Sequence, residues 1–277
     1  MKKNKKKLYI IYMLIFFPFA VMGQEINISS KLGLNTGQSA VIYIPKNFKP
    51  EVKGVDLLIH QHGLKDTVIS NFNKAGVNGV LIALNLGSLS GDYDRKYFAT
   101  KSNFTRLINV AKEEVEVNLR AKIEFKNIYL TAFSAGYGGV RAILRFPELF
   151  EMIKGTGLAD GMYCDKDQDS IKVQLDPFIR FAAQALAGKK KFILTHSEVE
   201  AFDYFTAEKA SELLMQKLGI AGNSDSSIDY TGTRIYSYES AKLKITGYKG
   251  DTGSDHFNHF LKISEIFRFL MKIERGE

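Results

Sequence analysis

The chain has 277 residues, of which 45% are hydrophobic and 25% charged, with 38 Lys and Arg against 30 Asp and Glu. This composition is typical of a globular protein, and it excludes a disordered chain, a collagen-like repeat and a disulfide-rich miniprotein. Cys164 is the only cysteine, which excludes an intramolecular disulfide and a thiolate metal cluster. The formal charge of +8 would suit a nucleic-acid partner, so the positions of the charges decide whether that partner is plausible.

The N-terminus has the pattern of a secretory signal peptide. Residues 1–7 are basic, residues 8–22 form a short apolar run, and Gly23 follows. The pattern predicts cleavage after Gly23, with an earlier cut near Ala20 as the alternative. The apolar run is short for a membrane span and contains Pro18, so a retained anchor is the second interpretation. We therefore expect a secreted or periplasmic protein with no stable membrane anchor after cleavage.

The predicted cleavage divides the chain into a signal peptide, residues 1–23, and one domain, residues 24–277. Five of the 38 basic residues are lysines of the signal peptide, so 33 basic residues remain against 30 acidic ones. Because the excess of positive charge is mostly removed with the signal peptide, we expect no nucleic-acid partner.

Aliphatic segments alternate with amphipathic ones along the rest of the chain. Short, continuously apolar segments predict buried strands at residues 39–44, 54–60, 79–86, 127–133, 153–159, 191–195 and 241–248. Helical spacing of apolar residues predicts helices at residues 65–75, 103–119, 138–146, 176–187, 207–218 and 256–273. The alternation predicts the α/β fold class: a doubly wound, mostly parallel sheet flanked by helices in a single domain.

Ser134 lies where a catalytic nucleophile would be expected. Residues 127–139, NIYLTAFSAGYGG, predict a strand, a sharp turn and the start of a helix. Such a turn raises the serine hydroxyl above the edge of the sheet, and it needs small neighbours. Ala132 and Gly136 are those neighbours, so the usual G-x-S-x-G pattern is relaxed to A-x-S-x-G. A serine that only caps the following helix is the structural alternative.

A second segment, residues 56–64, predicts an apolar strand that ends in His-Gly. A turn of this kind points a backbone N–H at the nucleophile, and the N–H groups of Leu64 and Ala135 would form the oxyanion hole. With these two segments, the chain resembles the α/β-hydrolase fold family over nearly all of its length after the signal peptide. The resemblance implies that the acid and the base follow the nucleophile in the order Ser, Asp or Glu, His.

His256 is the predicted base, because it lies at the junction between the last predicted strand and the last helix. His259 is the fallback and otherwise a pocket residue. Asp160, at the end of a predicted strand, is the favoured acid, and the alternatives for it are a strand-end turn and a substrate-contacting aspartate. Glu198 and Glu200, which follow the next strand, are the alternative acids.

Two segments are expected to wall a substrate pocket: residues 88–97, with two tyrosines and mixed charge, and residues 161–177. Their polar and aromatic composition favours a sugar-bearing or small polar substrate over a long lipid chain. The candidate pocket residues are His62, Tyr137, His196 and His259.

Two weaker patterns are typical of metal sites. Residues 165–176 place carboxylates at positions 1, 3, 5 and 12 of a calcium loop, but the sixth position is Ser170 instead of glycine, which favours a solvated turn. His60 and His62 form a His-x-His pair, but metal-dependent hydrolases need further ligands, and the chain has five histidines in all. We therefore expect no metal and no cofactor.

The sequence thus predicts an exported serine hydrolase that cleaves a carboxylic ester of a small molecule or polysaccharide through an acyl-enzyme intermediate. A peptidase on the same fold and a catalytically inactive binding protein of this fold are the alternatives.

Overall fold

The computed structural model describes residues 23–51 and 54–272. The predicted signal peptide therefore lies outside the described residues, apart from Gly23. Within the described ranges, no helix is long and apolar enough to cross a membrane.

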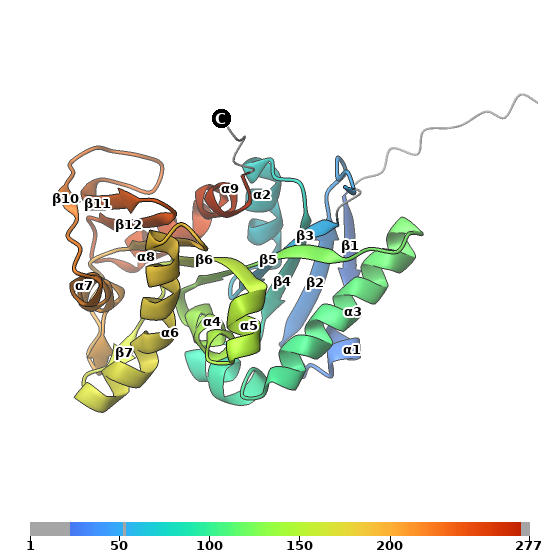
Figure 1. Ribbon diagram of the computed structural model, residues 1–277, viewed down its shortest axis with the longest axis horizontal. Helices are drawn as coiled ribbons and strands as arrows, with labels where there is room; N and C mark the ends of the chain where they lie inside the picture. Colours follow the sequence, from blue (N-terminus) through green and yellow to red (C-terminus); the bar gives the residue numbers. More distant parts are fainter. Residues whose placement is uncertain (1–22, 52–53, 273–277) are drawn as a thin grey trace, which may run out of the picture.

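A ten-stranded sheet forms the centre of the molecule (Figure 1). In chain order its strands are β1 (Gln24–Asn27), β2 (Ser39–Ile44), β3 (Val55–Gln61), β4 (Val80–Asn85), β5 (Phe125–Phe133), β6 (Ile153–Ala159), β8 (Lys191–His196), β10 (Asn223–Ser224), β11 (Arg234–Ser240) and β12 (Leu243–Tyr248). Their order across the sheet is β1-β2-β4-β3-β5-β6-β8-β12-β11-β10. The six strands from β4 to β12 in this order are parallel, and the two at each edge are antiparallel. A separate pair joins β7 (Cys164–Asp165) to β9 (Tyr204–Phe205).

Helices cover both faces of the sheet (Figure 1). They are α1 (Ser29–Leu32), α2 (Lys65–Ala75), α3 (Lys101–Leu119), α4 (Tyr137–Leu144), α5 (Pro147–Met152), α6 (Gln168–Leu186), α7 (Ala207–Leu218), α8 (Gly253–Leu261) and α9 (Ser264–Met271). The helices α2, α8 and α9 pack on one face, and α3 to α7 pack on the other. The predicted fold class, a mostly parallel sheet flanked by helices, is confirmed.

The central strands are mostly buried because helices cover them on both sides. In β4, five of the six residues are buried, and in β3 six of seven. A strand that is buried on both faces cannot alternate polar and apolar residues. This explains why the central strands were predicted close to their true bounds.

The strand order places the ends of β3 and β5 side by side. From β3 the chain moves to β4 on one side, and from β5 it moves through β6, β8 and β12 on the other. The sheet of an α/β fold opens at such a reversal, beyond the carboxyl ends of the strands. In the register, Gln61 lies opposite Ala132, so the turn after β3 lies beside the turn that holds Ser134.

The edges of the sheet and the helix bounds differ from the prediction. The strands β1, β10 and β11 were not predicted. No residue of β11 is buried, so its apolar signal in the sequence is weak. The predicted helix at residues 256–273 is two helices, α8 and α9, separated at Lys262 and Ile263. Helix α6 begins at Gln168, before the predicted start, and contains Pro177.

The early start of α6 shows that the calcium-loop interpretation is wrong. The side chain of Asp167 accepts the N–H of Ser170 at 2.8 Å and caps the helix. Asp169 and Asp176 lie within the helix and are exposed. A calcium loop needs these residues to curl around one ion, whereas a helix spreads them along its axis.

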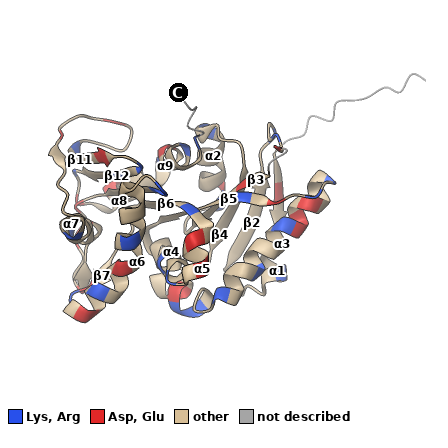
Figure 2. Ribbon diagram, in the orientation of Figure 1, with Lys and Arg blue, Asp and Glu red and all other residues tan. Residues whose placement is uncertain are grey.

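Basic and acidic residues are interspersed on the helices. Figure 2 shows Lys and Arg next to Asp and Glu along α3. This mixture agrees with the near balance of charge that remains without the N-terminal lysines.

Candidate active site

Ser134 occupies a strained turn between β5 and α4. The strand ends at Phe133, Ser134 starts a single 3₁₀ turn that ends at Gly136, and α4 begins at Tyr137. The backbone of Ser134 is left-handed, with φ of 44°, which is unfavourable for a residue with a side chain. Strain of this kind is concentrated at functional sites, where the surrounding structure maintains it.

Two glycines let neighbouring chain segments approach this turn. A methyl group on Gly136 would lie 2.1 Å from the carbonyl oxygen of Gln61, and one on Gly161 would lie 2.6 Å from that of Ser134. Both distances are far below van der Waals contact, so both positions require glycine. By contrast, Ala132 sits buried within β5, so the relaxed A-x-S-x-G pattern fits this fold.

His256 is brought to Ser134 by α8. Its Nε2 lies 2.9 Å from the Ser134 hydroxyl oxygen. A capping box between Thr252 and Asp255 fixes the first turn of the helix. The ring of Phe133 packs against the imidazole of His256 with 4.6 Å between the ring centres, and this contact limits the orientation of the imidazole.

Asp160, at the end of β6, binds the other side of the imidazole. Its Oδ2 lies 2.9 Å from Nδ1 of His256, and it is almost fully buried. The hydroxyl of Ser197 also donates to Oδ2, and the backbone N–H of Ser197 donates to Oδ1 at 3.1 Å. The carboxylate is therefore held by three donors from α8 and from the end of β8.

The protonation state of Asp160 sets the direction of the hydrogen-bond chain. Burial by itself raises the pKa of this carboxyl, but the hydrogen bond from His256, the nearby His259 and the hydroxyl of Ser197 outweigh it, so the pKa is below its usual value. An ionised carboxylate only accepts hydrogen bonds, so Nδ1 of His256 carries the proton. Its Nε2 then has a free lone pair, which accepts the hydroxyl proton of Ser134.

The turn after β3 contains the first predicted oxyanion donor. Leu64 directly precedes α2, and Ala135 follows Ser134, so the two N–H groups come from the adjacent turns after β3 and β5. His62 has φ of 76° and Gly63 has φ of 120°. A methyl group on Gly63 would lie 2.4 Å from the ring of Phe260, so this turn also packs closely against α8.

His62 is anchored at this turn by Tyr93. Its Nδ1 lies 3.1 Å from the carbonyl oxygen of Gly87 and 3.1 Å from the hydroxyl of Tyr93. The same hydroxyl accepts the N–H of Leu86 and donates to Asn85, both at 3.1 Å. Tyr93 is fully buried in a π-helical turn, Asp92–Tyr97, which belongs to the predicted wall segment.

The alternative acids lie elsewhere. The carboxylate of Glu198 accepts the N–H of Gly250 at 3.0 Å, and the N–H of Glu198 donates to the carbonyl of Gly250 at 2.9 Å. Glu198 thus ties the loop after β8 to the loop that leads to His256. Glu200 is exposed to solvent. Of the three carboxylates considered, the structure brings Asp160 to the imidazole.

Three other histidines are buried and bonded to the protein. Both ring nitrogens of His60 have partners, Thr131 at 2.9 Å and the carbonyl of His62 at 3.0 Å, and burial lowers its pKa to about 3. This leaves His60 unsuited to the metal pair with His62. The ring of His196 binds Tyr236 at 2.6 Å. His196 is therefore a structural residue of the strand end and not part of a pocket surface.

His259 and Tyr137 also have structural partners. Nδ1 of His259 lies 2.8 Å from the hydroxyl of Thr195, and burial lowers the pKa of His259 to about 4. Tyr137 is buried, and its ring lies 5.4 Å from that of Tyr163, whose hydroxyl donates to the carbonyl of Asp160 at 3.0 Å. Tyr137 therefore supports the surroundings of Asp160 from the first turn of α4.

Sequence reasoning missed Ser197, Tyr93 and Gly161. Ser197 directly follows His196, and Tyr93 lies in the segment predicted to wall a substrate pocket, so both residues lie close to recognisable sequence signals. Their roles depend on contacts between segments far apart in the chain. Ser197 reaches Asp160 across 37 positions, and Tyr93 reaches His62 across 31.

Comparisons with known proteins reveal similar folds without similar sequences. No family model matches the chain, and no curated protein matches it at a significant level. The BES protein from Bacillus cereus is 14% identical, with a TM-score of 0.56 over 98% of this chain and 100% of that one. A ferulic acid esterase is 12% identical, with a TM-score of 0.53 over 91% of this chain and 98% of that one.

A mutant of the feruloyl esterase module from Clostridium thermocellum, in complex with sinapinate, is 11% identical, with a TM-score of 0.50 over 92% of this chain and 90% of that one. At such identities the likeness is one of fold. It covers nearly the whole described chain.

Proposed function

The chain has the α/β-hydrolase fold, and from this premise we propose that it is an exported serine hydrolase that cleaves carboxylic esters through an acyl-enzyme intermediate. One observation carries the proposal: two hydrogen bonds of 2.9 Å join Ser134 to His256 and His256 to Asp160. The three residues come from the ends of β5 and β6 and from α8. A nucleophile, a base and an orienting carboxylate in this geometry are suited to acyl transfer.

In the first step, Ser134 Oγ attacks the ester carbonyl carbon while its proton passes to Nε2 of His256. The carbonyl oxygen becomes an oxyanion, for which the N–H groups of Leu64 and Ala135 are the proposed donors. The bond to the alcohol oxygen then breaks, and the leaving alkoxide takes the proton from Nε2. Ser134 is left acylated.

In the second step, a water molecule attacks the acyl carbon and gives its proton to the same nitrogen. The serine oxygen leaves and takes that proton back, which restores the enzyme and releases the acid. Throughout, Asp160 keeps the imidazole in the required tautomer and stabilises its protonated form. The steps use side chains and backbone groups of this chain, and we propose no cofactor.

The proposed substrate is a small polar or carbohydrate-linked ester. Two of the structural neighbours described above are named as esterases of ferulic acid or feruloyl groups, which supports ester cleavage. Export is proposed from the basic and apolar pattern of residues 1–23. The near balance of charge after that segment supports the absence of a nucleic-acid partner.

A fluorophosphonate probe tests the nucleophile directly. We expect the wild-type protein to be labelled and Ser134→Ala to remain unlabelled, with Ser70→Ala, a surface serine on α2, as the matched control. Unlabelled wild-type protein, or equal labelling of Ser134→Ala, would contradict the proposal. A panel of nitrophenyl esters and peptide anilides then separates an esterase from a peptidase, and we expect turnover of the esters alone.

A further inference from the structure

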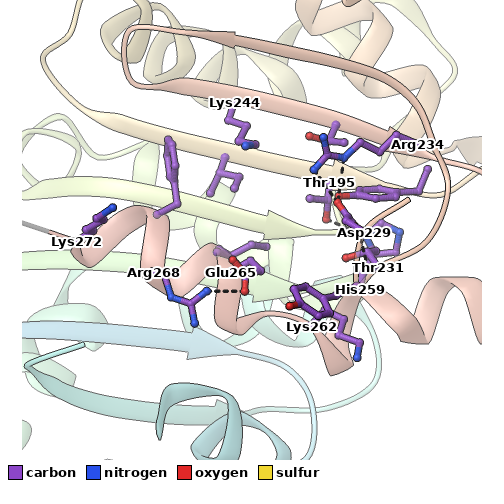
Figure 3. Close-up of a pocket in the computed structure, with 16 residues that line it drawn as sticks. Thr195, Asp229, Thr231, Arg234, Lys244, His259, Lys262, Glu265, Arg268 and Lys272 are labelled. Atoms are coloured by element: carbon purple, nitrogen blue, oxygen red, sulfur yellow. Dashed lines mark hydrogen bonds and ion pairs between the residues drawn. The ribbon is translucent and has the colours of Figure 1, made fainter. Parts of the chain in front are cut away.

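A cavity of about 370 Å³ lies between α9 and the strands β8 and β12 (Figure 3). Its size falls within the range of small-molecule sites, about 300 to 1,000 Å³. Ser134 and His256 are not among the residues that line it. The cavity does adjoin the proposed acid, because Thr195 lines it and the carbonyl of Thr195 accepts the N–H of Asp160 at 2.8 Å.

Two threonines and a histidine meet at one end of the cavity. In the parallel register of β8 and β12, Thr246 lies opposite Thr195, and adjacent strands are about 4.8 Å apart. Both threonines line the cavity, so both side chains lie on the same face of the sheet. The hydroxyl of Thr195 lies 2.8 Å from Nδ1 of His259, which places this imidazole beside the threonines. Figure 3 shows Thr195 and His259 together at one end of the cavity and Lys272 at the other.

Two polar groups at this end have no hydrogen-bond partner in the part of the chain that the structure describes. They are the hydroxyl of Thr246, whose side chain is 1% exposed, and Nε2 of His259, which is 3% exposed. Among the described residues, fully enclosed polar atoms without a partner occur only in Gln61, so these two groups are reached from the cavity that they line. Because polar groups in protein interiors are almost always hydrogen-bonded, both indicate a partner from outside the chain.

The surroundings of His259 favour an uncharged partner. Burial lowers the pKa of His259 to about 4, so its imidazole is neutral at pH 7. The carboxylate of Asp160 acts on the same imidazole and would repel an anion placed against it. Asp229, which also lines the cavity, pairs with Arg234 at 2.8 Å, so this pair offers a ligand little free charge. A hydroxyl group suits these conditions, because it is uncharged and both donates and accepts hydrogen bonds.

The apolar part of the lining is suited to a ring. Ile193 of β8 and Ile266 and Phe269 of α9 supply this surface. Burial of an apolar ring against these side chains is favourable, and Phe269 can stack on it or meet its edge.

We propose that this cavity binds a small uncharged molecule with an apolar ring and a hydroxyl group, with the hydroxyl against His259 and Thr246 and the ring against the isoleucines and Phe269. The hydroxyl donates to Nε2 of His259, whose Nδ1–H then donates to Thr195, and it accepts from the hydroxyl of Thr246. Binding does not use Ser134, although the site adjoins the proposed acid through Thr195.

A protein-observed NMR titration with phenol tests the site. We expect saturable shifts of the backbone amide signals of Thr246 and Phe269, with equal affinity in wild-type protein and in Ser134→Ala. Thr246→Val keeps the shape of the side chain but removes its hydroxyl, and it should weaken binding by about fivefold. His259→Phe keeps a ring without its nitrogens and should weaken binding at least as much. The control is Thr156→Val, which changes a fully buried threonine of β6 outside the lining and should leave the affinity unchanged.

Four outcomes would overturn the proposal. The first is the absence of saturable binding to folded wild-type protein, and the second is loss of binding in Ser134→Ala, which would place phenol at the proposed catalytic centre. The third is unchanged affinity in both Thr246→Val and His259→Phe, and the fourth is equal weakening by Thr156→Val. Circular dichroism of each variant confirms that it is folded.

Two further probes test the class of ligand. Toluene lacks the hydroxyl group and benzoate is an anion, so both should bind more weakly than phenol. Equal or tighter binding of toluene would contradict the role of the hydroxyl, and equal or tighter binding of benzoate would contradict the preference for an uncharged ligand.

Discussion

At the scale of single residues, Asp160 shows how burial and hydrogen bonding compete. Burial favours its protonated form, whereas His256 and Ser197 stabilise the carboxylate, and the pKa is lowered as a result. Its backbone φ of 41° is also left-handed. Five non-glycine residues have positive φ in the part of the chain that the structure describes, and three of them are His62, Ser134 and Asp160. Strain is thus gathered around the proposed catalytic hydrogen bonds.

Asp160→Asn should lower kcat for a nitrophenyl ester by a factor on the order of 10⁴ while KM changes little. The amide can donate to Nδ1, which would place the imidazole in the wrong tautomer for accepting the serine proton. Steady-state kinetics measure this change. Glu200→Gln changes an exposed carboxylate and is the control, so it should retain full activity. If Glu200→Gln instead loses activity while Asp160→Asn retains it, the acid is Glu200 and not Asp160.

Ser197→Ala should move the acid limb of the kcat/KM profile to higher pH. Without the hydroxyl donor, the pKa of Asp160 rises, so the carboxylate that orients His256 becomes protonated at a higher pH. Ser197→Thr keeps a hydroxyl and should restore the profile. An unshifted limb in Ser197→Ala would show that this hydrogen bond has no influence on the proposed base.

At the scale of elements, α8 holds His256 within reach of Ser134. The side chain of Thr252 accepts the N–H of Asp255, and Asp255 accepts in return from the backbone N–H of Thr252 at 3.0 Å. These bonds satisfy donors that the first turn of a helix leaves unpaired. The cap therefore fixes the part of the helix that contains the proposed base.

Thr252→Ala should lower the free energy of unfolding by about 1 kcal/mol and also lower kcat, because the cap and the base share one helical turn. Urea denaturation and ester kinetics measure the two effects. Thr100 is also the N-cap of a helix, α3, but its side chain makes no capping hydrogen bond. Thr100→Ala should therefore change neither quantity, and equal effects of the two substitutions would contradict the role given to the cap.

At the scale of the whole molecule, a buried ion pair joins the π-helical turn Asp92–Tyr97 to α4. Asp94, in the π-helical turn, accepts two hydrogen bonds from Arg141 of α4, at 2.6 and 2.9 Å, and one from Arg145 at 3.1 Å. The side chains of Asp94 and Arg141 are 6% and 9% exposed. Removal of one partner leaves a buried charge without compensation.

Asp94→Ala should lower the free energy of unfolding by about 3 to 5 kcal/mol. Glu148→Ala breaks the exposed pair with Lys101, whose side chains are 52% and 64% exposed, and should cost less than about 1 kcal/mol. Urea denaturation of both variants provides the comparison. Similar losses of stability in the two variants would show that the buried Asp94 pair contributes no more to stability than the exposed pair.

The buried histidines make stability depend on pH. The pKa is lowered to about 3 for His60 and to about 4 for His259, mainly by burial. Above pH 6.5 both are neutral in the folded and unfolded chains. As the pH falls below 6.5, the unfolded chain binds protons first, so we expect the free energy of unfolding to fall by about 1.4 kcal/mol per pH unit for each of them. Denaturation at pH 7 and pH 5 measures this loss, and equal stability at the two values would contradict it.

Much of the fold follows from local patterns. The central strands and the helices at Lys65–Ala75 and Ala207–Leu218 were predicted within a residue or two, because apolar runs and helical periodicity report burial directly. The sequence did not predict the edge strands β1, β10 and β11, because their exposed or half-exposed residues give a weaker apolar signal. The start of α6 was not predicted, because the acidic residues that precede and begin the helix are typical of a loop.

The sequence by itself determined the type and order of the central elements, and it indicated which serine, histidine and aspartate belong together, since each lies at the end of a recognisable strand or the start of a helix. Only the tertiary structure decided that Asp160, and not Glu198 or Glu200, lies against the imidazole, and that Ser197 and Tyr93 brace the site. The cavity between α9 and β12 likewise depends on how distant segments pack. Local patterns reflect burial and backbone preference, whereas contacts across tens of residues are set by the sheet order and its register.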